Sequence, residues 1–219
     1  MAHGRAPSDH QASPATVPAA GPAAAGLVEV AALDASIRTD VRYSTPANFM
    51  GRPLYPPGVP VMLQRPAAES LPKVAAALRP RGLGLLLFDG YRPWRVTKAM
   101  WDETAPEKRK FVASPERGSN HNRGCAIDLS LYDLATGREV EMPSAYDEMS
   151  PRAYGAYAGG TPVQREMRDL LKSEMRRAGW SPIRNEWWHF DWRDSDAYGV
   201  LDIPFPEPRP TAARPILKR

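Results

Sequence analysis

The sequence predicts an α+β fold, in which a small antiparallel sheet is flanked by helices. Two apolar runs, residues 82–93 and 125–133, end in turn residues, as buried strands do. Residues 162–178 carry the capping signals and the apolar stripe of an amphipathic helix. The aromatic-rich run 186–192 predicts one further strand. This order of elements favours a single small sheet with helices packed around it.

The first half of the chain is expected to fold in the order strand, helix, strand, helix. Residues 36–51 mix Ile, Val and Tyr with polar residues before Pro46 and Gly51, which is typical of a strand leading into a loop. Helix-forming residues then run up to Pro80 and Gly82, which end the helix. The elements expected here are a strand with its loop (36–51), a loop (52–60), a helix (67–78), a strand (82–93) and a short helix (96–103).

The second half contains the clearest helix. Thr161 is its expected N-cap, Pro162 occupies the first helical position, and Gln164 completes a capping box. Gly179 ends this helix. Its apolar stripe consists of Met167, Leu170, Leu171 and Met175. The other elements expected are a strand (125–133), a hairpin partner (138–142) that follows the turn Thr136-Gly137, a long loop (143–161) and a strand (186–192).

One domain, residues 27–202, is expected between two tails. Residues 1–26 contain nine Ala and four Pro but no aromatic, Leu or Ile residue, so we expect a disordered leader that cannot bury enough surface to fold. Prolines interrupt the apolar stretch that a secretory signal needs. A cytoplasmic protein is therefore expected, and export by an unusual route is the alternative. Residues 203–219 are expected to form a proline-rich basic tail.

Composition excludes several classes of protein. The formal net charge is +4, of which +3 comes from the C-terminal tail, with Arg209, Arg214, Lys218 and Arg219 against Glu207. The domain itself is nearly neutral, so it lacks the basic surface that nucleic-acid binding requires. No run approaches the roughly 20 consecutive apolar residues of a membrane span. A single cysteine, Cys125, excludes an internal disulfide and a zinc finger built on several thiolates. None of these features indicates an oligomeric state.

Both histidines of the domain lie close in sequence to a carboxylate. Asp128 follows His121 along a predicted strand, and Glu186 precedes His189 by three residues. Two imidazoles and a carboxylate are typical ligands of a catalytic zinc, which keeps one position for water. A glutamate that does not bind the metal can take the proton of that water. We therefore predict one zinc ion per chain, with His121, Asp128 and His189 as ligands and Glu186 as the base.

Each of these residues taken singly also has an ordinary structural interpretation. A lone histidine is more often hydrogen-bonded than metal-bound, an aspartate can cap a turn, and a glutamate can be a surface charge. In a regular strand, moreover, Glu186 and His189 face opposite sides, because side chains alternate. Both can serve one site only if the backbone bends or bulges there, or if Glu186 lies in the preceding loop.

Arg92 is a second candidate functional residue. It follows the Asp89-Gly90 turn at the end of a predicted strand, which holds its side chain at the end of the sheet. An arginine there can stabilise an oxyanion or bind a carboxylate through its fixed set of donors. It can equally be a structural arginine that binds backbone carbonyls or an acidic partner. Both interpretations stay open on the sequence.

Taken together, these motifs resemble a known family. DGYRP (89–93), S-x-H-x-x-G-x-A-x-D (119–128) and E-x-x-H (186–189) are similar to motifs of the D-alanyl-D-alanine dipeptidases of the VanX type. Those are zinc peptidases related to D,D-carboxypeptidases, lysostaphin-like endopeptidases and the Hedgehog fold, so a fold of that kind is expected. The segments ANFMG (47–51) and MPSAYD (142–147) resemble the dipeptidase branch in particular.

The resemblance implies roles for individual residues. It implies the same three zinc ligands and the same base as above, and it assigns Arg92 to the transition state. Asp147 matches the acid that binds the free ammonium group of the substrate, and Ser119 matches the serine near the substrate's carboxylate. The implied partner is a small dipeptide, and the preference for D-residues follows from the resemblance alone.

The expected function is zinc-dependent hydrolysis of D-alanyl-D-alanine to two D-alanines, in glycopeptide resistance or in salvage of D-alanine. A D,D-carboxypeptidase that acts on longer cell-wall peptides is the alternative enzyme. A non-catalytic module that binds wall peptides is the alternative outside catalysis. Such a module is expected to lack a metal ligand or the base, and all of these residue types are present here.

Overall fold

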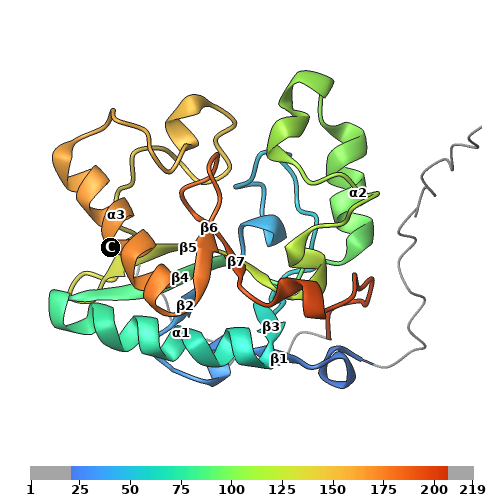
Figure 1. The fold of residues 1–219 in the computed structure, drawn as a ribbon, viewed down its shortest axis with the longest axis horizontal. Helices are drawn as coiled ribbons and strands as arrows, with labels where there is room; N and C mark the ends of the chain where they lie inside the picture. The colour runs from blue at the N-terminus through green and yellow to red at the C-terminus, as the bar shows by residue number, and fades with distance from the viewer. Residues whose placement is uncertain (1–20, 207–219) are drawn as a thin grey trace, which may run out of the picture.

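A computed structural model of the chain describes residues 21–206. Its central sheet has five strands in the order β2-β4-β5-β7-β6, and a separate two-stranded sheet pairs β1 with β3 (Figure 1). The strands are β1 (Leu27–Glu29), β2 (Arg38–Thr39), β3 (Met62–Gln64), β4 (Leu83–Asp89), β5 (Ala126–Asp133), β6 (Trp180–Pro182) and β7 (His189–Trp192). The α+β prediction is confirmed.

The sheet is antiparallel with one exception. β2 pairs with β4 in parallel, whereas the other neighbours in the central sheet are antiparallel. The chain passes through β3 and a helix between β2 and β4, and such a crossover returns it in the same direction. The antiparallel sheet expected from the sequence therefore has one parallel pair, at this edge.

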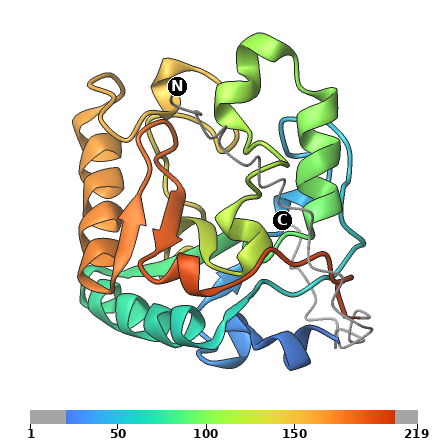
Figure 2. The same cartoon turned by 45° about the vertical axis from the view of Figure 1, so that its right-hand side comes forward.

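Residues 21–206 form three α-helices: α1 (Arg65–Leu78), α2 (Trp94–Glu103) and α3 (Pro162–Arg177). α1 and α3 pack against the sheet and against each other, whereas α2 lies at the other end of the molecule (Figure 1 and Figure 2). The indole Nε1 of Trp180 on β6 donates to Ser70 Oγ on α1 at 2.8 Å, which joins the sheet edge to this helix. Thr161 and Gln164 form the expected capping box of α3.

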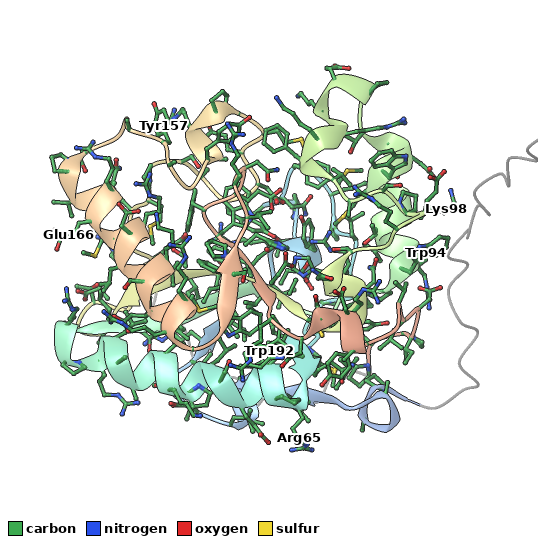
Figure 3. All side chains as sticks on the ribbon, in the orientation of Figure 1. Arg65, Trp94, Lys98, Tyr157, Glu166 and Trp192 are labelled. Atoms are coloured by element: carbon green, nitrogen blue, oxygen red, sulfur yellow. The ribbon has the colours of Figure 1, made fainter. Side chains whose placement is uncertain are left out.

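The core lies between the sheet and these helices. β4 and β5 are buried along almost their whole length, as the two apolar runs predicted. Figure 3 shows Trp192 lying between the sheet and α1, where it packs against Trp180, while Arg65, Lys98 and Glu166 point outward. None of the helices within residues 21–206 combines the length and apolarity that crossing a membrane requires.

Short 3-10 helices connect the larger elements. They span Pro22–Ala25, Val30–Ala32, Arg42–Ser44, Arg79–Arg81, Pro106–Phe111, Asn120–Arg123, Pro151–Ala153 and Ser195–Ala197. The first of them lies inside the predicted leader, and Phe205 in the predicted tail packs on Tyr55 and Tyr91. Folded structure therefore extends a few residues past both predicted domain boundaries. The rest of the leader and of the tail lies outside the described residues.

Two strand predictions need correction. The expected hairpin partner at 138–142 is shorter than predicted and forms one bridge, Tyr132 with Glu139. Two backbone hydrogen bonds of 2.9 Å flank this bridge, from Asp133 N–H to the Arg138 carbonyl and from Val140 N–H to the Leu131 carbonyl. The strand expected over 186–192 begins only at His189. Sequence analysis also missed β6, a three-residue edge strand that contains a proline, which cannot donate to a neighbouring strand.

Candidate active site

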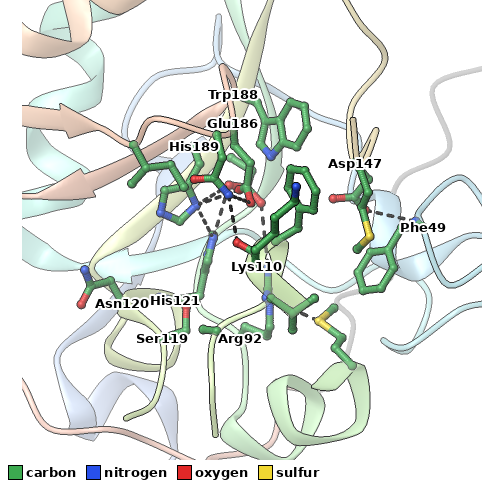
Figure 4. Close-up of a pocket in the computed structure, with 18 of the residues that line it drawn as sticks. Phe49, Arg92, Lys110, Ser119, Asn120, His121, Asp147, Glu186, Trp188 and His189 are labelled. Carbon is green, nitrogen blue, oxygen red and sulfur yellow. Dashed lines mark hydrogen bonds and ion pairs between the residues drawn. The ribbon is translucent and has the colours of Figure 1, made fainter. Parts of the chain in front are cut away.

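A pocket of about 520 Å³ opens beside the ends of β4, β5 and β7. The side chains that line it come from distant parts of the chain, as Figure 4 shows. All seven residues singled out from the sequence line this one pocket: Arg92, Ser119, His121, Asp128, Asp147, Glu186 and His189. The fold therefore brings together every candidate site residue.

The sheet register aligns part of the site in one row. Asp128 on β5 lies directly opposite Asp89 on β4 on one side and opposite His189 on β7 on the other. His121 comes from the 3-10 helix that precedes β5, and Ser119 caps this helix by accepting from the backbone N–H of His121. Gly124 ends it with a φ of 68°, a conformation that glycine adopts without strain and that turns the chain into β5.

Three potential metal ligands converge inside the pocket. His121 Nε2 lies 3.1 Å from His189 Nδ1 and 3.3 Å from Asp128 Oδ1. The remaining side of this triangle, His189 Nδ1 to Asp128 Oδ1, measures 2.9 Å. Ligand atoms about 2.0–2.1 Å from a tetrahedral zinc are about 3.3 Å apart. The spacing of the three atoms therefore fits one face of a zinc tetrahedron.

Hydrogen bonds on the outer nitrogens set which lone pairs face the pocket. His121 Nδ1 lies 2.7 Å from the carbonyl oxygen of Gly90, which can only accept, so this nitrogen carries a proton. His189 Nε2 lies 3.0 Å from Asp191 Oδ1, an acceptor when ionised. In the neutral rings, Nε2 of His121 and Nδ1 of His189 are then acceptors beside a carboxylate oxygen. Three acceptors at such short distances need positive charge between them, from a proton or a metal ion, and a metal ion fits the donor set.

Glu186 lies in the loop before β7, so the alternation of side chains along a strand does not set its side chain on the face opposite His189. Of the two explanations left open by the sequence, the loop placement is the correct one. Glu186 Oε2 is 3.9 Å from His189 Nδ1, and only 14% of the side chain is exposed. Burial raises the pKa of Glu186 to about 7. A carboxyl group with a pKa near neutrality is suited to accepting and returning a proton.

Arg92 is anchored by an aspartate that the sequence analysis did not single out. Its Nε and Nη2 both donate to Asp89 Oδ2, at 3.0 and 2.8 Å, and both side chains are buried. Asp89 Oδ1 accepts from Tyr55 Oη at 2.9 Å. The acidic-partner interpretation of Arg92 is thus correct. The guanidinium still lines the pocket, and its Nη2 is 3.8 Å from Asp128 Oδ2.

The turn between Asp89 and Arg92 requires a glycine. A Cβ on Gly90 would lie 2.7 Å from the carbonyl oxygen of Met62 and 2.8 Å from the Val61 side chain. This close packing of Gly90 places its carbonyl oxygen within hydrogen-bond distance of His121 Nδ1. The DGYR segment therefore orients a histidine as well as an arginine.

Asp147 forms the opposite wall of the pocket. Its φ of 60° is the only left-handed conformation of a non-glycine residue among residues 21–206. Tyr43 Oη donates to Asp147 Oδ1 at 3.1 Å, and the backbone N–H of Phe49 donates to Oδ2 at 3.3 Å. Burial raises the pKa of Asp147 to about 8, and no basic side chain of the described chain forms an ion pair with it. This carboxylate lacks a cation.

Comparison with known proteins agrees with the motifs. The family model described as D-ala-D-ala dipeptidase matches residues 23–207. The chain belongs to this family. It is 30% identical to the D-alanyl-D-alanine dipeptidase of Escherichia coli (strain K12) over 175 residues, which cover 80% of this chain and 89% of that protein. It is 36% identical to the D-alanyl-D-alanine dipeptidase of Enterococcus faecium over 178 residues, covering 72% and 87%. The resemblance stated from the sequence is thereby confirmed.

A solved structure of VanYB in complex with D-Alanine-D-Alanine is similar over part of this dipeptidase-family chain. The identity is 18%, the TM-score is 0.40, and the match covers 63% of this chain and 75% of that one.

The sequence of this dipeptidase-family protein held signals for several pocket residues that were not singled out. Phe49 lies in the segment ANFMG (47–51), which the family resemblance had already marked, and Tyr43 lies shortly before it, yet only the fold shows that both bind Asp147. Asp191 follows His189 by two residues on β7, so strand alternation alone places both on one face. Tyr146 directly precedes Asp147, and nothing in the sequence pairs it with Asp128.

Proposed function

We propose that this protein hydrolyses D-alanyl-D-alanine to two D-alanines, using zinc held by His121, Asp128 and His189. One observation carries the proposal. A single pocket joins a cluster of three metal-binding atoms, a buried glutamate beside it and, on the opposite wall, a buried carboxylate without a cation. The names of the two relatives above support the choice of substrate.

The pocket residues divide the chemistry among them. His121, Asp128 and His189 would hold the zinc ion, which would polarise the scissile carbonyl and lower the pKa of a bound water to about 7. Glu186 takes a proton from the attacking water and later passes one to the leaving amine. Arg92, fixed by Asp89, donates to the oxygen on which negative charge develops. These roles need no residue from outside the pocket.

The two ends of a free dipeptide carry opposite charges. Asp147 receives the ammonium group, which supplies the cation that its buried carboxylate lacks. Ser119 donates its hydroxyl hydrogen to the substrate's carboxylate, while its oxygen accepts from the backbone N–H of His121. A pocket that tests both ends selects a dipeptide over a longer chain.

Replacing the charge of Asp147 tests the ammonium site. We expect Asp147→Asn to raise KM for D-alanyl-D-alanine about 10–100-fold, because a hydrogen bond to a charged group contributes about 1.5–3 kcal/mol. The value of kcat is expected to change much less. Steady-state kinetics on the dipeptide and on its N-acetylated form measure this, since the variant should also lose its preference for the free amine. The exposed Asp196→Asn is the control, and an unchanged KM in Asp147→Asn would remove this residue from the site.

The proposed activity itself is tested by release of free alanine. D-Ala-D-Ala, L-Ala-L-Ala and a pentapeptide ending in D-Ala-D-Ala are assayed in parallel, each with and without a metal chelator. We expect cleavage of the D,D-dipeptide alone, and its loss on chelation. Cleavage of the pentapeptide would assign the protein to the D,D-carboxypeptidases instead. No cleavage by zinc-loaded protein would favour a binding module.

The setting of the reaction is part of the same proposal. We propose that the reaction takes place in the cytoplasm. There the reaction lowers the supply of D-alanyl-D-alanine, as glycopeptide resistance requires, and releases D-alanine for reuse.

A further inference from the structure

The two carboxylate oxygens of Asp128 have separate surroundings. Oδ1 faces His121 Nε2 at 3.3 Å and His189 Nδ1 at 2.9 Å, in the position expected for a metal ligand. Oδ2 accepts a hydrogen bond from Tyr146 Oη at 3.0 Å. Without this bond, Oδ2 would keep only the longer approach of Arg92 Nη2, at 3.8 Å. The tyrosine hydroxyl therefore makes the one direct hydrogen bond to the outer oxygen.

The ring of Tyr146 is held on several sides. Its centroid lies 4.8 Å from that of Phe88, 5.3 Å from Trp188 and 6.2 Å from Tyr43. Only 9% of the residue is exposed. A ring packed in this way has no alternative rotamer of similar energy, so the hydroxyl stays aimed at Asp128.

We propose that Tyr146 is a positioning residue, whose hydroxyl fixes the Asp128 carboxylate so that Oδ1 faces the metal. The inference rests on the proposed function in taking this cluster to be a zinc site. Partners that bind the outer atoms of a metal ligand orient that ligand, and their loss typically weakens metal binding about 10–100-fold. Tyr146 acts through Asp128 and needs no contact with the substrate.

The same residue also connects the metal cluster to the ammonium site. Tyr146 is followed directly by Asp147, whose carboxylate accepts from Tyr43 Oη. Tyr146 reaches Asp128 from behind the metal cluster, whereas the next residue, Asp147, has a left-handed backbone and lines the pocket. Two adjacent residues of the loop 143–150 thus have separate roles. Tyr146 fixes Asp128, and Asp147 carries the carboxylate that receives the amine.

The experiment is a zinc competition measurement on the full chain. Tyr146→Phe removes one hydroxyl and keeps the packed ring. We expect its dissociation constant for Zn²⁺, measured against a chromophoric chelator, to rise at least about tenfold. The visible absorption of the Co²⁺-loaded variant should also differ from that of the wild type, because the orientation of the Asp128 carboxylate relative to the metal changes.

Tyr132→Phe is the matched control. Its hydroxyl donates to the carbonyl oxygen of Ser36 at 2.7 Å, far from the pocket, and the substitution also removes one tyrosine hydrogen bond. We expect this variant to bind Zn²⁺ as the wild type does. Equal Zn²⁺ affinity in Tyr146→Phe and the wild type would overturn the proposal, as would an equal loss in both variants.

A second measurement distinguishes weaker zinc binding from a general loss of stability in the variant. The rise in Tm on adding Zn²⁺ is compared with the metal-free form of the same variant, so a lower starting stability cancels. A smaller rise in Tyr146→Phe supports the proposal, and an unchanged rise contradicts it. None of these measurements uses a substrate. A chain that fails to cleave D-alanyl-D-alanine but shows the metal effect would therefore refute the proposed activity and leave this inference standing.

Discussion

We expect Glu186→Ala to lower kcat for D-alanyl-D-alanine by about 10²–10⁴-fold, the usual contribution of a general base, while the protein still binds zinc. The reason lies in the position of Glu186. Its carboxylate is beside the cluster, 3.9 Å from His189 Nδ1, but it is not one of the three converging ligands. The substitution would remove the proposed base and leave the three converging atoms in place.

The measurement pairs kcat with metal content. Turnover is assayed at saturating dipeptide, and bound zinc is determined on the same preparation. Glu186→Gln keeps the size of the side chain and should be impaired to a similar degree, because an amide cannot accept and return a proton in this way. The exposed Glu166→Ala on α3 is the control. Substantial turnover in zinc-loaded Glu186→Ala would show that another group is the base.

We expect Arg92→Ala to have two separate effects, one on stability and one on catalysis. Asp89 is 1% exposed, and its ion pair with Arg92 is the only one shorter than 3 Å that it makes within residues 21–206. Breaking a buried pair by removing one partner costs about 3–5 kcal/mol, because the other charge is left buried. Loss of a donor to the developing oxyanion lowers kcat about 10²–10³-fold.

The two effects are measured apart. Urea unfolding gives the free energy of unfolding, and kcat is determined at a temperature where the variant is folded. Arg168→Ala is the matched control, because Arg168 is also a buried arginine but lies on α3 and binds the carbonyl oxygen of Tyr157. We expect that variant to be less stable with an unchanged kcat. An Arg92→Ala enzyme that is destabilised but has wild-type kcat would leave this arginine with a structural role alone.

Local sequence patterns were sufficient for the elements that the site rests on. The apolar runs of β4 and β5, and the capping residues of α3, act over a few neighbouring positions, so they can be read without knowing the fold. The same holds for the candidate metal ligands, since few residue types bind zinc and the domain contains only two histidines. Their convergence in one site was predicted from these residue types, and the family resemblance implied the same three ligands.

The tertiary structure decided the contacts between distant segments. Asp128 meets His189 through the register of two strands, and it meets Tyr146 through the path of a loop. The parallel pairing of β2 with β4 likewise depends on a crossover. No local pattern encodes such pairs, because the two partners are distant in the sequence. Only the path of the whole chain brings their side chains together. The sequence by itself determined which groups could do the chemistry, and the fold determined which of them hold one another in place.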